Sequence, residues 1–285
     1  MDENILEVTG LCKDYGEFKL SNLTLALPRG MVLGLVGANG AGKTTLIKLL
    51  LGVIKPTSGT ISILGGSPQQ SELRDKIGVV FDELSMQEAL TPVQCGKIMG
   101  GIYKEWDSAR YTQLLTQLEL PQKQAIKAFS RGMRMKLSLA LAMSHHAELL
   151  LLDEPTGGLD PMVRQEILDL FRDFMLDENH SILISSHITS DLARLADYIA
   201  YLDRGSLLLL EEKDRLMEEY GTVKGKKSEL DGLDATALLG LHTEALGFEG
   251  LTRHREEMQR RYPELVVDHA ALDEIMTFIV REARK

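Results

Sequence analysis

The sequence predicts an α/β fold organised around a largely parallel sheet, because continuous apolar runs alternate with segments of helical periodicity. The apolar runs are MVLGLVG at residues 31–37, AELLLLDE at 147–154 and HSILISSH at 180–187. Such runs are typical of strands that are covered on both faces. Residues 46–50 and 163–174, which follow the first two runs, carry apolar side chains at helical spacing. Helices are therefore expected on the faces of the sheet.

Further strands are expected on both sides of this core. Residues 4–30 alternate apolar and polar positions and end in turn signals. GTISILGG at 59–66 and KIGVVFDE at 76–83 are two more candidate strands. Residues 198–212 predict a hairpin that turns at Asp203 to Gly205.

The chain divides into a large domain and a small one. Residues 91–127 are mostly helical in pattern, and we place a helical subdomain at about residues 83–148. The composition becomes polar and glycine-containing after about residue 220, which favours a domain at 1–217 and a small accessory α+β domain at 218–285. One amphipathic helix is expected at 271–285.

Composition excludes several classes of protein. The chain has 285 residues, of which 44% are hydrophobic and 26% charged, as expected of a packed soluble core. The net charge of −10 argues against a broad nucleic-acid surface. The two cysteines, Cys12 and Cys95, have no metal-ligand spacing and fit a reduced compartment. The first residues are acidic, unlike a signal peptide, and no apolar run approaches the roughly 18 residues of a membrane span. We therefore expect a cytoplasmic protein, which would need another chain to act at a membrane.

A phosphate-binding loop follows the first apolar run. GANGAGKTT at Gly37–Thr45 satisfies G-x-x-x-x-G-K-[ST], between an expected strand and an expected helix. Backbone N–H groups of such a loop surround phosphate oxygens, and the helix N-terminus adds partial positive charge. Lys43 can reach the β- and γ-phosphates, and the Thr44 hydroxyl can ligate Mg²⁺. The nucleotide-binding candidates are Gly37, Asn39, Gly40, Ala41, Gly42, Lys43, Thr44 and Thr45. The motif alone leaves kinases, GTPases and ATPases open.

Two acids end the second apolar run. Asp153 and Glu154 follow four consecutive leucines with no polar spacer. Buried carboxylates are costly unless a cation meets them, and parallel strands deliver their last residues to the ligand crevice. We expect Asp153 to hold Mg²⁺, directly or through water, and Glu154 to polarise an attacking water. The alternative is a strand end that only reaches solvent.

The order of the motifs resembles that of ABC ATPases. FSRGM, from Phe129 to Met133, resembles the signature usually written LSGGQ, and it lies between the phosphate loop and LLLLDEPTGGLD. SSH, ending at His187, completes the order. This resemblance covers about residues 4 to 215. It implies an α/β fold with a P-loop ATPase core, an antiparallel β subdomain and a helical subdomain, extended here by the small accessory domain.

The resemblance also implies partners and cofactors. In this family two ATPase domains meet head to tail, and each ATP lies between one phosphate loop and the opposite signature. Ser130 and Gly132 would then serve the ATP of a second ATPase subunit, which is either a twin or a related chain. ATP and Mg²⁺ are the implied cofactors. The helical subdomain would dock on a separate transmembrane permease at the cytoplasmic face of the membrane, and no nucleic acid is expected.

Three more residues gain roles from the resemblance. His187 would contact the γ-phosphate and help to position the attacking water, although a lone histidine is more often structural. Asp160 matches the loop that touches the opposite domain, and it can also be a helix N-cap. Tyr15 matches the aromatic residue that stacks on adenine, against the alternative of a surface or packing role. His145 and His146, at a helix end, are expected to be capping or solvated side chains.

The sequence departs from the family pattern in two places. Asp82 or Glu83 occupies the position of the usual glutamine, which puts the coupling to metal in doubt, and Asp82 is retained as a candidate Mg²⁺ ligand. The signature carries Arg131 and Met133 where glycine and glutamine are common. Similar S-x-G-M forms occur in bacterial antibiotic-peptide and drug exporters of the bacitracin-efflux type.

These features together predict the ATP-hydrolysing subunit of an ABC transporter that exports its substrate. Two alternatives from other classes stay open, namely a soluble ABC ATPase in translation or repair and a switch that binds ATP without hydrolysing it.

Overall fold

The computed structural model describes residues 4–284, apart from the side chains of Asp231 and Ala235. The outer limits of the two expected domains, residues 1 and 285, lie outside the described residues. The strands are β1 (Asn4–Asp14), β2 (Lys19–Pro28), β3 (Val32–Val36), β4 (Ser58–Ile63), β5 (Ile77–Val80), β6 (Leu149–Asp153), β7 (Ser181–Ser186), β8 (Tyr198–Asp203), β9 (Ser206–Glu212), β10 (Gly221–Lys226), β11 (Leu239–Thr243), β12 (Gly247–Thr252) and β13 (Val266–His269). The helices are α1 (Lys43–Leu50), α2 (Ser71–Arg74), α3 (Pro92–Gly100), α4 (Ser108–Gln117), α5 (Arg131–Ala142), α6 (Pro161–Phe174), α7 (Thr189–Leu195), α8 (Lys213–Glu219), α9 (Arg255–Arg261) and α10 (Leu272–Ala283).

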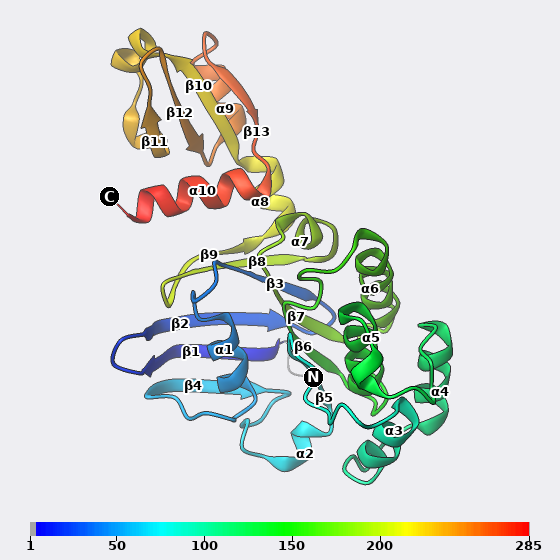
Figure 1. The fold of residues 1–285 in the computed structure, drawn as a ribbon. Helices are drawn as coiled ribbons and strands as arrows, with labels where there is room; N and C mark the ends of the chain where they lie inside the picture. Colours follow the sequence, from blue (N-terminus) through cyan, green and yellow to red (C-terminus); the bar gives the residue numbers. More distant parts are fainter. Residues whose placement is uncertain (1–3, 285) are drawn as a thin grey trace.

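A mixed sheet of order β5-β6-β7-β3-β8-β9 forms the centre of the molecule (Figure 1). Its first five strands are parallel, and β9 returns antiparallel to β8 after a turn at Arg204 and Gly205, as the sequence predicted. Parallel pairing brings the carboxyl ends of β3, β6 and β7 to one edge of the sheet. The phosphate loop, the two acids and the SSH segment therefore meet there.

The two faces of this sheet pack against different elements. Alternate residues such as Leu33, Leu151 and Leu183 pack with α1 and with an antiparallel sheet of order β2-β1-β4. The residues between them, such as Leu150 and Ile182, pack with α5, α6 and α7. Covering both faces explains why β3, β6 and β7 are buried along their whole length.

The helices α3, α4 and α5 form a lobe to one side of the central sheet (Figure 1). Sequence signals define where they begin. Thr91 forms a capping box with Gln94 before Pro92, Asp107 caps α4, and Ser130 caps α5 by accepting from the Met133 N–H at 3.2 Å. Ser130 is thus the N-cap of α5.

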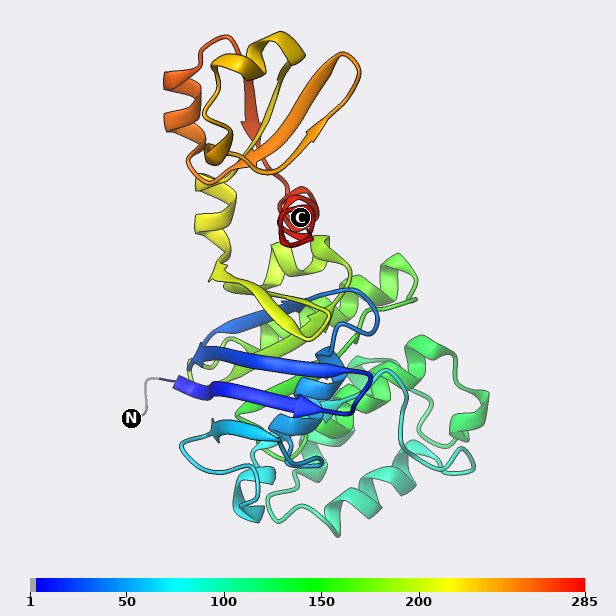
Figure 2. The ribbon, with the colours of Figure 1, turned by 90° about the vertical axis from the view of Figure 1, so that its left-hand side faces the viewer.

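The last part of the chain forms a second sheet, of order β11-β12-β10-β13, with α9 on it. Helix α10 lies between this sheet and the rest of the molecule (Figures 1 and 2). Its apolar residues Ile275, Met276 and Ile279 belong to the same hydrophobic cluster as residues of α7 and the central sheet. Beyond the helix, Arg284 Nη2 pairs with Asp203 Oδ1 at 3.1 Å, at the end of β8. Leu251 of β12 belongs to this cluster too, so one face of the second sheet shares a core with the first sheet, whereas Val223 and Phe248 belong to a separate cluster.

Of the two roles expected for His145, capping or solvated, the solvated one is wrong. Only 1% of His145 is exposed, and its ring stacks on Tyr103 with the centroids 3.9 Å apart. Its Nε2 lies 3.2 Å from the Ile77 carbonyl oxygen. His146 is exposed, as expected. Within residues 4–284, none of the helices combines the length and the apolar character that crossing a bilayer requires.

Candidate active site

The phosphate loop connects β3 to α1. Gly40 and Gly42 have φ values of +80° and +112°, which only glycine adopts without strain. Gly37 is required for space, because a Cβ there would lie 2.4 Å from the Leu202 carbonyl oxygen. The loop therefore rests directly on the end of β8. Its shape leaves Asn39 exposed and Ala41 buried.

Lys43 is nearly enclosed, with 6% of its side chain exposed. Its ammonium donates to the carbonyl oxygens of Gly37 at 2.6 Å and Ala38 at 3.3 Å. It also lies 3.1 Å from Glu154 Oε1. The lysine charge is thus already held at the mouth of the loop, where a polyphosphate would compete for it.

Asp153 connects three elements of the site. Thr44, in the first turn of α1, donates its hydroxyl to Asp153 Oδ2 at 2.6 Å. Ser185, on β7, donates to Asp153 Oδ1 at 2.7 Å. The Glu154 N–H in turn donates to Ser185 Oγ at 3.1 Å. A carboxylate that is 95% buried is therefore met by two hydroxyl groups, and the sequence did not single out Ser185.

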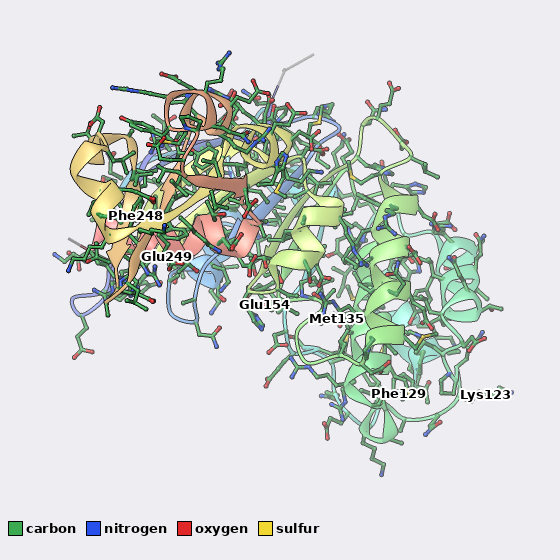
Figure 3. All side chains as sticks on the ribbon, turned by 90° about the horizontal axis from the view of Figure 1, so that it is seen from above. Lys123, Phe129, Met135, Glu154, Phe248 and Glu249 are labelled. Atoms are coloured by element: carbon green, nitrogen blue, oxygen red, sulfur yellow. The ribbon has the colours of Figure 1, made fainter. Side chains whose placement is uncertain are left out.

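Glu154 and His187 form a hydrogen-bonded pair. His187 Nδ1 lies 2.7 Å from Glu154 Oε2. Because a carboxylate only accepts, Nδ1 carries the proton and Nε2 is left as an acceptor when the ring is neutral. Glu154 has a φ of +52°, an uncommon value for a residue other than glycine that costs about 1–3 kcal/mol and is concentrated at functional sites. Seen from above in Figure 3, Glu154 projects closer to Met135 of α5 than to Phe248 of the second sheet.

The remaining predicted residues lie around this centre. Asp160 caps α6 by accepting from the N–H groups of Met162 and Val163, each at 3.1 Å. Gly132 is buried, and a Cβ there would lie 3.0 Å from Val163, so the signature helix packs closely on α6. Tyr15 is 52% exposed, and Lys13 Nζ lies 5.0 Å from its ring centre. Thr45 is partly buried beside Thr44.

Asp82 has a different neighbour from the one that the sequence suggested. Its carboxylate is paired with Arg131, the first residue of the signature helix. The pair joins the loop after β5 to the start of α5. Sequence reasoning noted both residues separately and did not connect them.

Comparisons with known proteins agree with this geometry. A family model described as ABC transporter matches residues 20–157. The lantibiotic transport ATP-binding protein SrtF of Streptococcus pyogenes is 36% identical over 213 residues, which cover 74% of this chain and 92% of that protein. The chain belongs to the ABC transporter ATP-binding family. The bacitracin transport ATP-binding protein BcrA of Bacillus licheniformis is 37% identical over 211 residues, which cover 72% of this chain and 68% of that protein.

Solved ABC structures share the fold. An ATP-binding subunit of an ABC transporter matches with a TM-score of 0.66 and 27% identity, covering 74% of this chain and 91% of that chain. The dimeric ATP-binding cassette MJ0796, bound to ADP and Pi, matches with a TM-score of 0.65 and 22% identity, covering 73% of this chain and 98% of that chain. The prediction of an ABC ATPase with antiparallel and helical parts is confirmed. The chain is an ATP-binding subunit with the ATPase activity of its family.

Proposed function

We propose that this ATPase is Mg²⁺-dependent and drives an exporter through ATP-dependent pairing with a second ATPase subunit. The observation that carries the proposal is the convergence of Lys43, Glu154 and His187 beside the hydrogen-bonded Thr44 and Asp153. A phosphate-binding cation, a water-polarising acid and two oxygen ligands are the parts that phosphoryl transfer to water requires.

Magnesium fits the chemistry of two of these groups. Mg²⁺ prefers hard oxygen ligands, and the Thr44 hydroxyl and the Asp153 carboxylate present oxygens 2.6 Å apart. When bound there, the metal would neutralise charge on the β- and γ-phosphates. Asp82 is proposed as an additional ligand, for which it would first have to leave Arg131.

The chain's own residues would divide the work as follows. Lys43 leaves Glu154 and pairs with the phosphates, because a polyphosphate is the stronger anionic partner. Glu154 then accepts a hydrogen bond from the attacking water. His187 is fixed by its Nδ1–H bond to Glu154, so Nε2 is free to accept a hydrogen bond and would help to position the attacking water, whereas a contact with the γ-phosphate would require Nε2 to donate. Tyr15 stacks on the adenine.

The second subunit completes the site. We propose a head-to-tail pair in which the exposed Ser130 at the start of α5, and the backbone of the buried Gly132 in its first turn, contact the ATP that the partner holds. The first turn of a helix favours an anion because its N–H groups point outward. Asp160, next to the signature helix across Gly132 and α6, would contact the partner chain.

The proposed transport role also implies a partner protein and a location in the cell. Its relatives include proteins named for lantibiotic and bacitracin transport. We propose that this chain likewise serves the export of an antibiotic peptide or a drug, bound to a separate permease on the cytoplasmic face of the membrane. Residues 1–217 would act as the ATPase domain, with the lobe at about 83–148 facing the permease and 218–285 as an accessory domain. No nucleic-acid partner is proposed.

Two experiments test the proposal. Phosphate release is measured with and without Mg²⁺ for the parent protein, Lys43→Ala and Glu154→Gln. We expect Lys43→Ala to lose ATP binding and Glu154→Gln to bind ATP with turnover reduced at least 100-fold. Equal turnover by Lys43→Ala would refute the site, and no turnover by the ATP-bound parent would favour a non-hydrolysing switch.

The second experiment identifies the partner. Isolation of the tagged chain from membranes in mild detergent should recover an integral membrane protein in a fixed ratio. Recovery of ribosomes instead would support the soluble alternative.

A further inference from the structure

Two residues that depart from the family pattern, Asp82 and Arg131, contact each other in this structure. The family position of a neutral glutamine holds an acid, and the signature holds Arg131. Arg131 Nη2 donates to Asp82 Oδ1, so Asp82 is the acid that has a partner in α5. The two changes carry opposite charges, and each supplies the counter-ion of the other.

The pair connects segments that have different tasks. Asp82 lies on the loop that leaves the central sheet after β5, and Arg131 is the first residue of α5. The same guanidinium also lies on the loop that leads to Asp160, because a Cβ at Gly158 would be 3.0 Å from Arg131 Nη1. Arg131 therefore contacts both loops that flank the signature.

The pair is accessible to a competitor. The side chains of Arg131 and Asp82 are 52% and 51% exposed. Exposed pairs of this kind contribute little to stability, so another anion can displace the carboxylate. A cleft of about 450 Å³ opens beside them, and its lining includes the acids Asp82, Glu83 and Glu88 from the loop and Arg131 and Arg134 from α5.

A second link would keep the loop in place when the pair opens. Arg134 Nη1 lies 2.8 Å from Glu88 Oε1, and the Lys127 N–H donates to the Glu88 carbonyl oxygen at 2.9 Å. Opening of the first pair can therefore release the Asp82 carboxylate without detaching the loop from the helical lobe.

We propose that Arg131 is a positioning residue that exchanges one anion for another. In the separate chain it neutralises Asp82, and in the ATP-bound pair it transfers to a phosphate oxygen of the ATP held by the second subunit. This inference rests on the proposed function, because it requires the opposite signature to meet that ATP. Arginine suits the exchange, since its planar guanidinium binds carboxylates and phosphates in the same bidentate manner. The helix N-terminus at Ser130 adds to the attraction for phosphate.

The consequence concerns timing. Asp82 loses its cation only when ATP and the second subunit are both present. Its negative charge on the loop after β5 then becomes available to the metal, to water or to a neighbouring chain. An Asp82 carboxylate that has lost Arg131 thus marks the closed, ATP-bound pair of subunits.

The test uses binding rather than turnover. In a Glu154→Gln background, the ATP concentration that gives half-maximal dimerisation is measured by analytical ultracentrifugation. Asp82→Asn frees Arg131 for the phosphate, and we expect this concentration to fall by about two- to five-fold, in line with a weak exposed pair. Arg131→Met removes a charge-assisted bond to phosphate, and we expect a rise of about ten-fold or more. The matched control is Glu88→Gln, which opens the neighbouring pair and should stay within two-fold of the background.

The outcomes separate this inference from the function on which it rests. If the background protein does not dimerise with ATP, the head-to-tail proposal fails and the inference fails with it. Suppose instead that the background protein dimerises, that Asp82→Asn and Arg131→Met both weaken the dimer, and that exchanging the two charges restores it. The pair is then a permanent contact between the two segments, and only the inference is overturned. An equal shift for Glu88→Gln would also overturn it. Should Arg131→Met not fold, Arg131→Lys replaces it and should weaken the dimer by about two- to three-fold.

Discussion

Ser185→Ala tests how the buried acids are held. Ser185 donates to Asp153 Oδ1 at 2.7 Å and accepts from the Glu154 N–H at 3.1 Å. Both serines at the end of β7 are fully buried, but the Ser186 hydroxyl makes no hydrogen bond to a charged group among residues 4–284 and accepts from the Ile188 N–H at 2.9 Å. Ser186→Ala is therefore a control of the same size, depth and strand.

The magnitudes follow from the charge of the partners. A hydrogen bond to an ionised group contributes about 1.5–3 kcal/mol, whereas a neutral one contributes about 0.5–1.5 kcal/mol. We expect Ser185→Ala to lower the free energy of unfolding by about 2–3 kcal/mol and Ser186→Ala by about 1 kcal/mol. Alanine at 185 leaves Asp153 with one described hydroxyl donor, Thr44, so turnover should also fall about ten-fold.

Urea unfolding followed by circular dichroism, without nucleotide, measures the stability difference. Phosphate release measures the difference in turnover. Equal destabilisation by the two variants, or a Ser185→Ala protein as stable as the parent, would refute the idea that the Ser185 hydroxyl supports the buried Asp153 carboxylate.

Three further changes have defined outcomes. Gly37→Ala places a Cβ 2.4 Å from the Leu202 carbonyl oxygen, so nucleotide affinity measured by fluorescence titration should fall more than ten-fold. Burial lowers the pKa of His145 in the folded protein, so the unfolded chain takes up the proton at a higher pH than the folded chain does. The free energy of unfolding therefore falls as the pH drops below about 6.5. His145→Asn should flatten that decline in urea titrations from pH 7.5 to 5.5. Arg164→Met strips the cation from Asp191, which is 2% exposed, and should cost about 3–5 kcal/mol of unfolding free energy.

Each of these changes has a control elsewhere in the chain. A Cβ at Gly101 would lie 3.3 Å from the Ile98 carbonyl oxygen, far from the nucleotide site, so Gly101→Ala should leave nucleotide affinity unchanged. His146→Asn alters an exposed ring and should preserve the pH dependence. Arg172→Met opens an exposed pair with Asp169 and should cost less than about 1 kcal/mol. A control that behaves like its partner variant would contradict the corresponding prediction.

The nucleotide site could be predicted because its chemistry is local in sequence. Lys43 and Thr44 follow a strand and open a helix, and Asp153 and Glu154 end an apolar run, so strand order alone brings them together. Ser185 could not be distinguished in the same way, since a serine at a strand end has many roles. Its signal was its place in SSH, two residues before His187.

Other features depend on contacts between distant residues. Asp82 and Arg131 are 49 residues apart, and nothing local in the sequence pairs them. The burial of His145 depends on Tyr103 and on the Ile77 carbonyl oxygen, which belong to other elements. The order β11-β12-β10-β13 is likewise fixed by the register between short strands rather than by their composition.

The position of α10 has a consequence for the way the chain is made. Helix α10 packs against α7 and β9, yet the whole second sheet lies between β9 and α10 in the chain. During synthesis on the ribosome, the ATPase core therefore emerges with an uncovered apolar surface that awaits Ile275, Met276 and Ile279. Exposed apolar surface of this kind attracts chaperones or leads to aggregation until translation supplies its cover.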